Sequence, residues 1–470
     1  MNFNELRSGI KSRELSISVF GLGRIGLPTA LMFTKAGYCV NGVDIDKELL
    51  DDLREGDTFI DEPGLPELLD QALNENLIEF TSNFENAIKN ADILIICVPT
   101  PVSENKVPDY SAVRDISMKI GENIRRNQIV ICESSISPTT IRDVIIPIIE
   151  RNSDLSVNKD FGVCSCPERA DPGKIIDNFN KVTRIVGGSS KHVGKVVIEL
   201  YESITDADII QLSTPGTANA VKLTENIFRD VNIALMNELA VLYEKLDIDI
   251  KEVIKGASTK YNFQPHYPGP GVGGPCLPAN PYYVIQDADK KDYIPFLIRV
   301  AREVNDRMPA YVLDLVTNAL NFVGKSIKGT NITCLGLSYK ANVRDTQISP
   351  AVKIIRLLKK KKSYKTNIGD EHLSPSLESS NLKVFDPYYK GETVKTIKVE
   401  ESLQTALKDT ECVVLLTDHE EFKKLDFKSI EMDEKNPLVL VDSRNIYDFD
   451  DLPKFVVYSG VGRRLRFMNG

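Results

Sequence analysis

A β-rich run followed at once by three spaced glycines constrains the fold of this chain more than any other feature. Residues 16–20 (Ser-Ile-Ser-Val-Phe) are expected to be a strand, and Gly21-Leu-Gly-Arg-Ile-Gly26 follows directly. A helix is expected over residues 27–36, and a second strand over residues 39–44. In this strand–turn–helix–strand context, glycines at this spacing allow a tight turn, a close backbone approach to a diphosphate and close helix packing. The pattern predicts a dinucleotide-binding unit.

An acidic residue at the end of the second expected strand indicates which dinucleotide is bound. Asp44 stands eighteen residues after Gly26, near the usual place of the carboxylate that binds the ribose hydroxyls. A carboxylate there would repel the 2′-phosphate of NADP, so NAD is the expected cofactor. The alternative is a tight turn with an incidental acid. The expected cofactor contacts in this region are Gly21, Gly23, Arg24, Ile25, Gly26 and Asp44.

The alternation of strands and helices continues along the chain. Further apolar strands are expected at 93–98, 129–132 and 161–164, separated by helical segments, which is typical of a parallel, doubly wound sheet. A second α/β region begins near Thr330, with expected strands at 332–335, 383–386, 412–416 and 438–442. It lacks the glycine fingerprint, so a second dinucleotide is not expected there. The predicted fold class is α/β, with two doubly wound Rossmann-like domains joined by a central helical domain.

A long helix is expected between the two α/β regions. Residues 217–246 are apolar on more than one face, which indicates burial between domains or subunits. The expected domains are 1–211 (cofactor-binding), 212–322 (central, helical) and 323–470 (C-terminal). Residues 359–381 are Lys-rich and then Ser-rich, and we expect them to form an exposed insertion.

The composition excludes several functional classes. A chain of 470 residues is too long for one core, and its net charge of −9 argues against nucleic-acid binding. No run approaches the ~18 apolar residues of a membrane span. The eight cysteines show no ligand spacing, and Cys164-Ser-Cys166 does not fit the common zinc motifs, so we expect reduced thiols, a cytoplasmic protein and no metal.

One cysteine lies in an unusual loop. Residues 268–281 contain four glycines and five prolines around Cys276, which excludes helix or central strand. Such a loop holds one thiol in a fixed place. Together with a hydride acceptor, a thiol suggests oxidation through a thiohemiacetal and a thioester. The alternative is a free, buried cysteine in a tight turn.

Six motifs in order resemble the UDP-glucose/GDP-mannose 6-dehydrogenase family over nearly the whole chain. They are Gly21-Leu-Gly-Arg-Ile-Gly-Leu-Pro-Thr-Ala30, Val98-Pro-Thr-Pro101, Cys166-Pro-Glu-Arg169, Val221-Lys-Leu-Thr-Glu-Asn-Ile-Phe-Arg229, Gly271-Val-Gly-Gly-Pro-Cys276 and Gly336-Leu-Ser-Tyr-Lys340. The resemblance implies four-electron oxidation of carbon six of a nucleotide sugar to a carboxylate, with two NAD+. It also implies a dimerising central domain, a homodimer or higher oligomer, and a C-terminal nucleotide-sugar domain.

The resemblance implies roles for particular residues. Cys276 matches the nucleophile, Lys222 the oxyanion-stabilising lysine, and Asn226 the asparagine that holds substrate and water. Glu168 matches a glutamate that assists hydrolysis and proton transfer. The alternative for Lys222 and Asn226 is a solvated helix face. For Glu168 it is a surface salt bridge with Arg169.

Three departures from the family pattern bear on substrate and mechanism. Asn280 occupies the position of the usual Asp, so it can hold a water but cannot accept its proton. Ala279 replaces a lysine, and Arg169 replaces an aromatic residue of the glucose enzymes. The pattern is similar to the branch that acts on UDP-N-acetylhexosamines, where Arg169 would donate to an acetamido carbonyl. UDP-N-acetylmannosamine or UDP-N-acetylglucosamine is therefore favoured over UDP-glucose, and the sugar stays open.

Positions that match the family imply further contacts with the cofactor and the substrate. Pro99, Thr100 and Ser135 match NAD-contacting positions. The expected substrate contacts are Arg169, Lys260, Tyr267, Gly273, Lys340, Arg344 and Arg444. Lys260 is as readily explained as a plain surface lysine.

Two other functions compete with the four-electron enzyme, whose product would serve cell-surface polysaccharide or glycan synthesis. A two-electron dehydrogenase would stop at the aldehyde and release one NADH per sugar. A non-catalytic nucleotide-sugar sensor would bind without forming NADH, and Asn280 is its only support in the sequence.

Overall fold

The computed structural model describes residues 1–169, 173–363, 382–430 and 432–467. The chain divides into two compact units, each made of two stretches of sequence. Unit 1 comprises residues 1–226 and 279–294, and unit 2 comprises residues 227–278 and 295–470. The segment 212–322, expected to be a central helical domain, contributes helices to both units.

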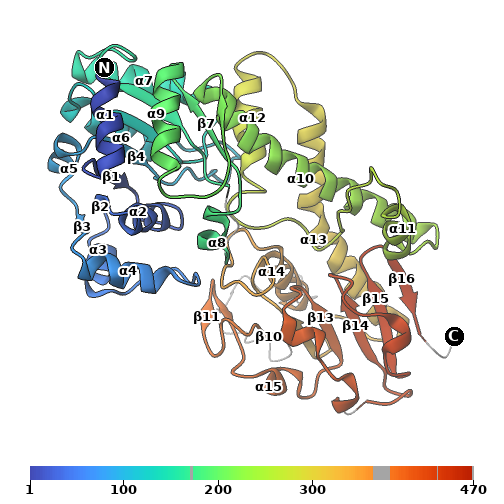
Figure 1. Ribbon diagram of the computed structural model, residues 1–470. Helices are drawn as coiled ribbons and strands as arrows, with labels where there is room; N and C mark the ends of the chain where they lie inside the picture. Colours follow the sequence, from blue (N-terminus) through green and yellow to red (C-terminus); the bar gives the residue numbers. More distant parts are fainter. Residues whose placement is uncertain (170–172, 364–381, 431, 468–470) are drawn as a thin grey trace, which may run out of the picture. The chain divides into compact units, whose positions relative to one another are not determined.

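Unit 1 is built on an eight-stranded sheet (Figure 1). Its strand order is β3-β2-β1-β4-β5-β6-β7-β8, so the chain reverses direction across the sheet between β1 and β4. This reversal creates the crevice in which open α/β sheets bind their ligands. The strands are β1 (Ser16–Phe20), β2 (Cys39–Val43), β3 (Ile78–Thr81), β4 (Ile93–Ile96), β5 (Ile129–Cys132), β6 (Gly162–Ser165), β7 (Arg184–Gly188) and β8 (Ile209–Leu212).

The sheet is not parallel throughout, which corrects the sequence-based expectation. The six neighbouring strands β3, β2, β1, β4, β5 and β6 are parallel. Strand β7 pairs antiparallel with β6, and β8 is parallel to β7. Among the described residues of the connection between β6 and β7, the only helix is the five-residue α8 (Ile175–Phe179). The chain therefore returns along the sheet from the end where β6 stopped, without a crossover to the opposite end.

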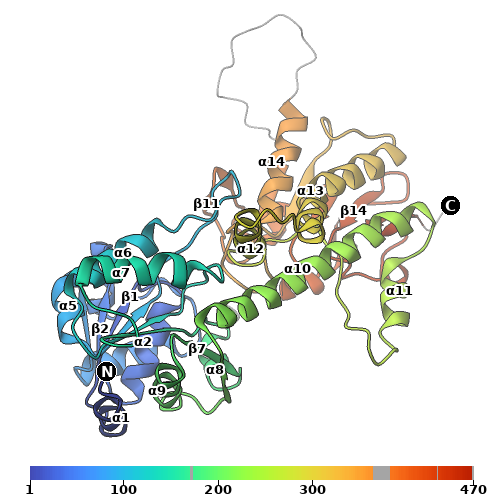
Figure 2. The same cartoon turned by 90° about the horizontal axis from the view of Figure 1, so that it is seen from above.

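Helices cover both faces of this sheet. Figure 2 shows α6 (Ser111–Asn123) and α7 (Ile146–Ser153) on one face, and α1 (Phe3–Ser12) and α9 (Lys191–Tyr201) on the other. The helix α1 was not expected from the sequence. The remaining helices of the unit are α2 (Gly26–Lys35), α3 (Lys47–Glu55), α4 (Leu65–Asn74), α5 (Phe84–Asn90), the π-helix η1 (Ile141–Ile145) and α12 (Asn280–Asp289).

Unit 2 is built on a six-stranded sheet of order β10-β9-β13-β14-β15-β16. Only β16 runs antiparallel to its neighbour. The strands are β9 (Ile332–Leu335), β10 (Leu382–Phe385), β13 (Cys412–Leu415), β14 (Leu438–Asp442), β15 (Val456–Gly460) and β16 (Arg463–Arg466), with a separate hairpin of β11 (Thr393–Val394) and β12 (Ile397–Lys398). Its helices are α11 (Ile250–Ala257), α13 (Phe296–Phe322), α14 (Pro350–Ser363), α15 (Leu403–Leu407) and α16 (Glu420–Lys423), with short 3-10 turns η2 (Phe427–Ser429) and η3 (Phe449–Asp451).

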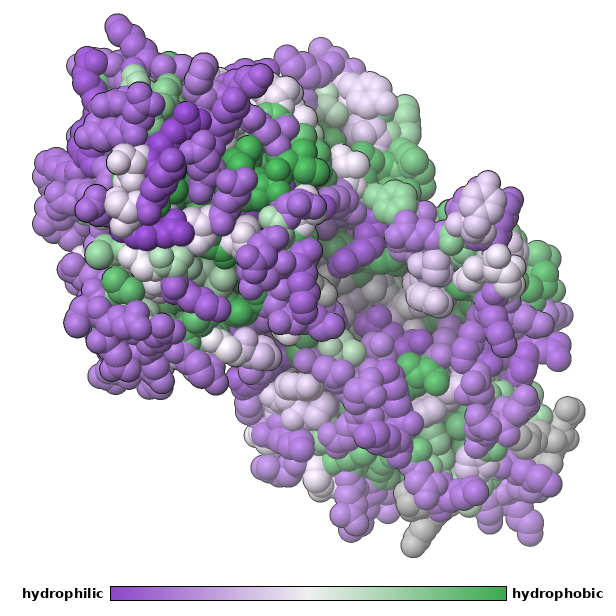
Figure 3. All heavy atoms as spheres, viewed as in Figure 1, coloured by the Kyte–Doolittle hydropathy of each residue, from purple (hydrophilic) through white to green (hydrophobic). Residues whose placement is uncertain are grey.

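The predicted fold class is confirmed. Both units have a doubly wound, mainly parallel sheet, and the expected long helix is α10 (Pro215–Lys245), which runs from unit 1 into unit 2. The expected insertion over 359–381 begins inside α14, and its residues 364–381 lie outside the described part of the chain. No helix in that described part is long and apolar enough to cross a membrane. The face of unit 1 visible in Figure 3 is mostly hydrophilic.

In unit 2 a buried polar network joins α10 to α13. Arg302 is paired with Asp230 at 2.5 Å, and both side chains are nearly inaccessible to solvent. Asn305 donates to Asp230 Oδ1 at 2.9 Å and accepts from Asn237 Nδ2 at 2.8 Å. Asn237 Oδ1 accepts the amide of Gly269, the second residue of the glycine-rich loop (residues 268–281). The network therefore anchors one end of the loop that carries Cys276.

We expect Arg302→Met to destabilise unit 2 by about 3–5 kcal/mol, because the substitution leaves the Asp230 carboxylate buried without its partner. Chemical denaturation followed by circular dichroism measures the change. Arg307→Met is the control, since the Arg307–Glu303 pair lies on the exposed face of the same helix. Equal stability of the two variants would contradict a structural role for the network.

Candidate functional site

The glycine fingerprint forms a turn that has no room for side chains. Gly21 has φ 91°, and a Cβ on Gly26 would stand 1.8 Å from the carbonyl oxygen of Gly21. The space around a Cβ on Gly23 is open to 4 Å. Gly26 therefore permits close helix packing, while Gly23 leaves backbone accessible to a ligand at the start of α2. These features fit a dinucleotide diphosphate at a helix N-terminus.

Asp44 follows β2 and holds this turn. Its Oδ2 accepts the amide of Leu22 at 2.8 Å, and its Oδ1 accepts the amide of Asp46 at 3.1 Å. The residue is partly exposed, so its carboxylate can also accept hydrogen bonds from a ribose. The geometry fits the expected cofactor, NAD.

Two other expected cofactor positions lie next to each other at the ends of β4 and β5. Thr100 Oγ1 donates to the carbonyl oxygen of Ser135 at 2.7 Å. Tyr283 of α12 donates its hydroxyl to Thr100. Pro99 is exposed beside them. No role for Tyr283 was predicted from the sequence.

The first half of α10 brings two expected catalytic residues to unit 1. Lys222 is 9% exposed and has no hydrogen-bond or ion-pair partner among the described residues. Asn226 Nδ2 donates to Asn280 Oδ1 at 2.5 Å, which joins two expected catalytic amides. Ser165 at the end of β6 donates to Asn219 of α10 at 2.7 Å and so fixes this part of the helix. The solvated helix face proposed as an alternative does not describe the buried Lys222.

Glu168 does not form the surface salt bridge with the Arg169 side chain that was considered from the sequence. It is paired with the buried Arg184 at 2.9 Å, and its Oε1 accepts the backbone amide of Arg169. Arg169 instead forms a two-pronged ion pair with Glu225 and donates to the carbonyl oxygen of Thr183. That alternative was wrong because Glu168 pairs with the guanidinium of Arg184, which is distant in sequence.

Cys276 belongs to unit 2, and its residue is exposed. The alternative of a buried cysteine is therefore wrong. Gly274 has φ 91°, and its amide donates to the carbonyl oxygen of Gln347 at 2.9 Å. A Cβ on Gly273 or Gly274 would stand 2.7 Å from the side chain of Tyr339. These glycines thus seat the loop directly on the turn that follows β9.

The same turn carries other expected substrate contacts. Arg444 Nε donates to the carbonyl oxygen of Leu416 at 3.0 Å, and its Nη2 donates to that of Tyr339 at 3.3 Å. Lys340 follows Tyr339 and is partly exposed. Arg344 points elsewhere, to the carbonyl oxygen of Tyr388 and to the Glu392 carboxylate at 2.6 Å.

Two expected substrate contacts are well exposed. Lys260 lies in the loop after α11. Tyr267, one residue before the proline that begins the glycine-rich loop, is 67% exposed. The structure brings Gly273, Lys340 and Arg444 together around Tyr339 in unit 2, whereas Arg344 pairs with Glu392.

A buried Asp–His pair, which the sequence analysis missed, holds the turn after β9. Asp386 Oδ2 accepts the amides of Leu337 at 2.7 Å and Ser338 at 3.0 Å. His419 lies 3.2 Å from the same carboxylate, and its Nδ1 accepts the amide of Asn342. Burial opposes ionisation of Asp386, but His419 and the turn amides lower its pKa below the ordinary value. Asp386 ends its strand as Asp44 does, and that shared position was the available signal.

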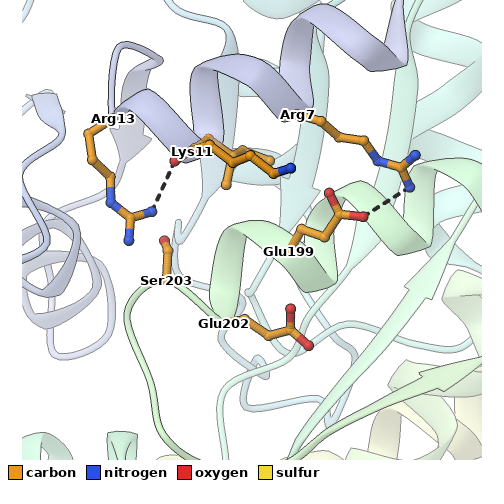
Figure 4. A pocket seen from close by; sticks show the side chains of 7 residues that line it. Arg7, Lys11, Arg13, Glu199, Glu202 and Ser203 are labelled. Carbon is orange, nitrogen blue, oxygen red and sulfur yellow. Dashed lines mark hydrogen bonds and ion pairs between the residues drawn. The ribbon is translucent and has the colours of Figure 1, made fainter.

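A hollow of about 640 Å³ lies between α1 and α9 (Figure 4), and none of the expected site residues lines it. Arg7 is paired with Glu199 across it at 2.9 Å, and Arg13 donates to the carbonyl oxygen of Ile10. Its other lining residues are Lys11, Glu202 and Ser203. The Arg7–Glu199 pair neutralises one of its cations and one of its acids.

The fold and the fingerprint define an NAD-dependent dehydrogenase with a second α/β domain. Comparison with known families matches residues 15–205 to the NAD binding domain, 216–307 to the central domain and 333–449 to the UDP binding domain of the UDP-glucose/GDP-mannose dehydrogenase family. The chain belongs to this family and is an NAD-dependent nucleotide-sugar dehydrogenase. The resemblance inferred from its motifs is confirmed.

Curated relatives and solved structures match nearly the whole length of the chain. The UDP-N-acetyl-D-mannosamine dehydrogenase of Pyrococcus horikoshii is 34% identical over 96% of this chain and 99% of that protein. The UDP-N-acetyl-D-glucosamine 6-dehydrogenase of Salmonella typhi is 30% identical over 92% of this chain and 96% of that protein. The structure of the Pyrococcus horikoshii UDP-D-ManNAc dehydrogenase, 34% identical, matches with a TM-score of 0.84 over 96% of this chain and 99% of that one.

We expect Asp44→Ala to weaken NAD binding about tenfold, which corresponds to about 1.4 kcal/mol, and to reduce the preference for NAD over NADP. The variant loses both the ribose acceptor and the bond that holds the Leu22 amide. Isothermal titration with each dinucleotide measures the effect. Glu79→Ala, at an exposed acid of the edge strand β3, is the control. Unchanged NAD affinity in the Asp44 variant would contradict this assignment.

Proposed function

We propose that this chain oxidises the carbon-six primary alcohol of a UDP-N-acetylhexosamine to a carboxylate, in two oxidations, through a covalent intermediate on Cys276. One observation carries the proposal: an exposed thiol stands in a glycine-fixed loop packed on the first turn of the UDP-binding domain. The curated names of the relatives, which act on UDP-N-acetyl sugars, support the choice of substrate class. The product is a uronate for cell-surface polysaccharide or glycan synthesis.

The chemistry assigns a task to each expected catalytic residue. Bound NAD supplies the hydride acceptor for each oxidation. The Cys276 sulfur adds to the carbon-six aldehyde, forming an S–C bond while the carbonyl oxygen takes a proton, so the aldehyde is not released. Lys222 donates to the developing oxyanion. Loss of a hydride to the acceptor and of the hydroxyl proton converts the thiohemiacetal to a thioester. Water then adds to the thioester, the S–C bond breaks to restore the thiol, and the carboxylate and a proton are released.

Asn280 changes how the last step is carried out. Its amide oxygen accepts a hydrogen bond from Asn226, and an amide cannot take a proton from water. We assign the paired amides to holding the water and Glu168 to accepting its proton. Arg184, 2.9 Å away, favours the ionised form of Glu168 that this role needs.

The substrate side of the proposal rests on unit 2 and on Arg169. Lys340 and Arg444 are assigned to binding the UDP moiety, and Gly273 and Tyr267 to lying beside it. Lys260 and Arg344 are assigned to more distant contacts with the substrate. Arg169 is assigned to the acetamido group. Because its guanidinium is engaged by Glu225 and Thr183, it would donate to the sugar only by exchanging one of these partners. UDP-glucose is the alternative substrate if no such exchange occurs.

A side-by-side assay tests the function. UDP-glucose, UDP-N-acetylglucosamine, UDP-N-acetylmannosamine and GDP-mannose are each run to completion in limiting amount with excess NAD+. We expect two NADH per molecule from an acetamido sugar. One NADH per sugar with free aldehyde would indicate a two-electron enzyme, and tight binding without NADH would indicate a sensor.

We expect Cys276→Ser to lower turnover to the carboxylate by about 10³-fold or more, because the alkoxide nucleophile is far less accessible than a thiolate. The variant should keep its affinity for the UDP-sugar. Quenched-flow analysis of the sugar product gives the rate, and calorimetry gives the affinity. Cys39→Ser, at another exposed cysteine, is the control. Full carboxylate formation by the Cys276 variant would contradict the covalent route.

We also propose that the chain forms a homodimer through α10 and α13. Within unit 2, α10 exposes Phe228, Leu235 and Leu242 at intervals of seven residues. The first turns of α13 expose Phe296, Leu297 and Val300. Exposed apolar stripes of this kind are typical of subunit interfaces.

Sedimentation measures the oligomeric state of the chain. We expect a dimer for the natural chain and a shift to monomer for the double variant Leu235→Glu, Leu242→Glu, because two carboxylates would be buried at the interface. Met118→Glu, at an exposed apolar residue of α6, is the control and should leave the dimer intact. A double variant that sediments as a dimer would place the interface elsewhere.

A further inference from the structure

Unit 1 contains a second carboxylate close to Glu168 that no motif pointed to. Glu133 directly follows β5, Glu168 lies three residues after β6, and Arg184 is the first residue of β7. The three side chains are 0%, 9% and 6% exposed, respectively. The cluster thus sits where β5, β6 and the reversed strand β7 meet, with one guanidinium between two carboxyl groups.

Arg184 is fixed closer to one carboxyl group than to the other. Its Nη2 lies 2.9 Å from Glu168 Oε2, and its Nη1 lies 3.9 Å from Glu133 Oε1. The guanidinium also packs over the rings of Phe179 at 4.0 Å and Tyr201 at 5.1 Å. The aromatic contacts restrict its movement, so Glu133 is left with the longer, weaker interaction.

The other partners of Glu133 are neutral. Thr29 of α2 donates to its Oε2 at 2.8 Å, Tyr201 of α9 donates to its Oε1 at 2.5 Å, and the Cys97 thiol lies 3.5 Å away. Burial raises the pKa values of Tyr201 and Cys97 well above their ordinary values, so both stay protonated. A hydroxyl group can also accept a hydrogen bond, so Thr29 or Tyr201 can face a protonated carboxyl group equally well.

An ionised Glu133 would therefore be a fully buried anion beside another carboxylate. Such a charge is costly unless a cation contacts it closely. The titratable and charged groups around it are Cys97 after β4, Cys132 of β5, Cys166 and Glu168 after β6, Arg184 of β7 and Tyr201 of α9. Burial raises the pKa of Glu133; Arg184 lowers it and Glu168 raises it further.

We propose that Glu133 is a neutral carboxylic acid at neutral pH and acts as a positioning residue, leaving Arg184 to hold Glu168 ionised and in place. Loss of its proton at higher pH creates a second carboxylate that competes for Arg184 and loosens Glu168. The link to turnover rests on the proposed role of Glu168 in thioester hydrolysis. The protonation state of Glu133 does not depend on that role.

Infrared difference spectroscopy of the full chain without substrate tests the protonation state. Glu133→Gln should remove the carbonyl band of a protonated carboxyl group at pH 7, and Asp160→Asn should not. Asp160→Asn is the matched control, since Asp160 is buried but its pKa is lowered by the Ser156 amide and by Arg126. A band that persists undiminished in Glu133→Gln would overturn the proposal.

The pH dependence of stability gives a second readout that needs no activity. Because the folded state raises the pKa of Glu133 above its ordinary 4.5, stability from this group declines as pH rises from 4.5 through the folded pKa. Glu133→Gln cannot ionise. Its melting temperature relative to the natural chain should therefore rise with pH across that window. A difference that stays constant or falls would overturn the assignment.

Turnover as a function of pH tests the positioning role. The natural chain should lose turnover on the alkaline side as Glu133 ionises, and Glu133→Gln should retain it to higher pH. An unchanged alkaline limb would overturn the positioning role. Failure of turnover in both proteins, with the infrared result as expected, would instead count against the proposed function and leave the proton on Glu133.

Discussion

A carboxylate at the end of one strand holds the ligand-side turn after the neighbouring strand, and both units depend on this interaction. Asp44 after β2 accepts the amide of Leu22 in the turn after β1, and Asp386 after β10 accepts the amides of Leu337 and Ser338 after β9. The two carboxylates differ in their other contacts. Asp44 is partly exposed and can receive a ribose, whereas Asp386 is fully buried against His419. The same interaction therefore holds both turns, and in unit 1 it leaves the carboxylate partly exposed.

The proposed chemistry draws on both units of the chain. Lys222, Asn226, Asn280 and Glu168 belong to unit 1, and Cys276 belongs to unit 2. The loop of Cys276 is fixed at one end by the network of Asp230, Arg302, Asn305 and Asn237, and in its middle by contact of its glycines with Tyr339. Buried polar groups and absent side chains, more than local helix or strand propensity, therefore determine where the thiol stands.

Much of the fold was predictable from the sequence, because apolar runs and turn residues are local signals. The strands at 16–20, 39–43, 129–132 and 438–442, the helix α10 and the fingerprint turn all lie where they were expected. The reversal of β7 was not predictable from such signals, since strand direction depends on the path of the connection. The helix α1 was also missed.

The site was predicted less completely, for a physical reason. Matched motifs named Glu168, but its ion-pair partner Arg184 and the adjacent Glu133 come from separate strand ends that only the folded sheet brings together. Tyr283 and His419 were missed in the same way, because each acts through a backbone or side-chain partner far away in sequence. Buried charge pairing of this kind leaves no local pattern.

The covalent route on Cys276 is the central claim, and mass spectrometry of the enzyme during turnover tests it most directly. The Glu168→Gln variant, in which hydrolysis should be slow, would be mixed with UDP-N-acetylmannosamine and NAD+, quenched and digested. The account predicts an acyl adduct on the peptide that carries Cys276, present with NAD+ and absent without it. An unmodified Cys276 peptide, together with carboxylate product forming at the rate of the natural chain, would contradict it.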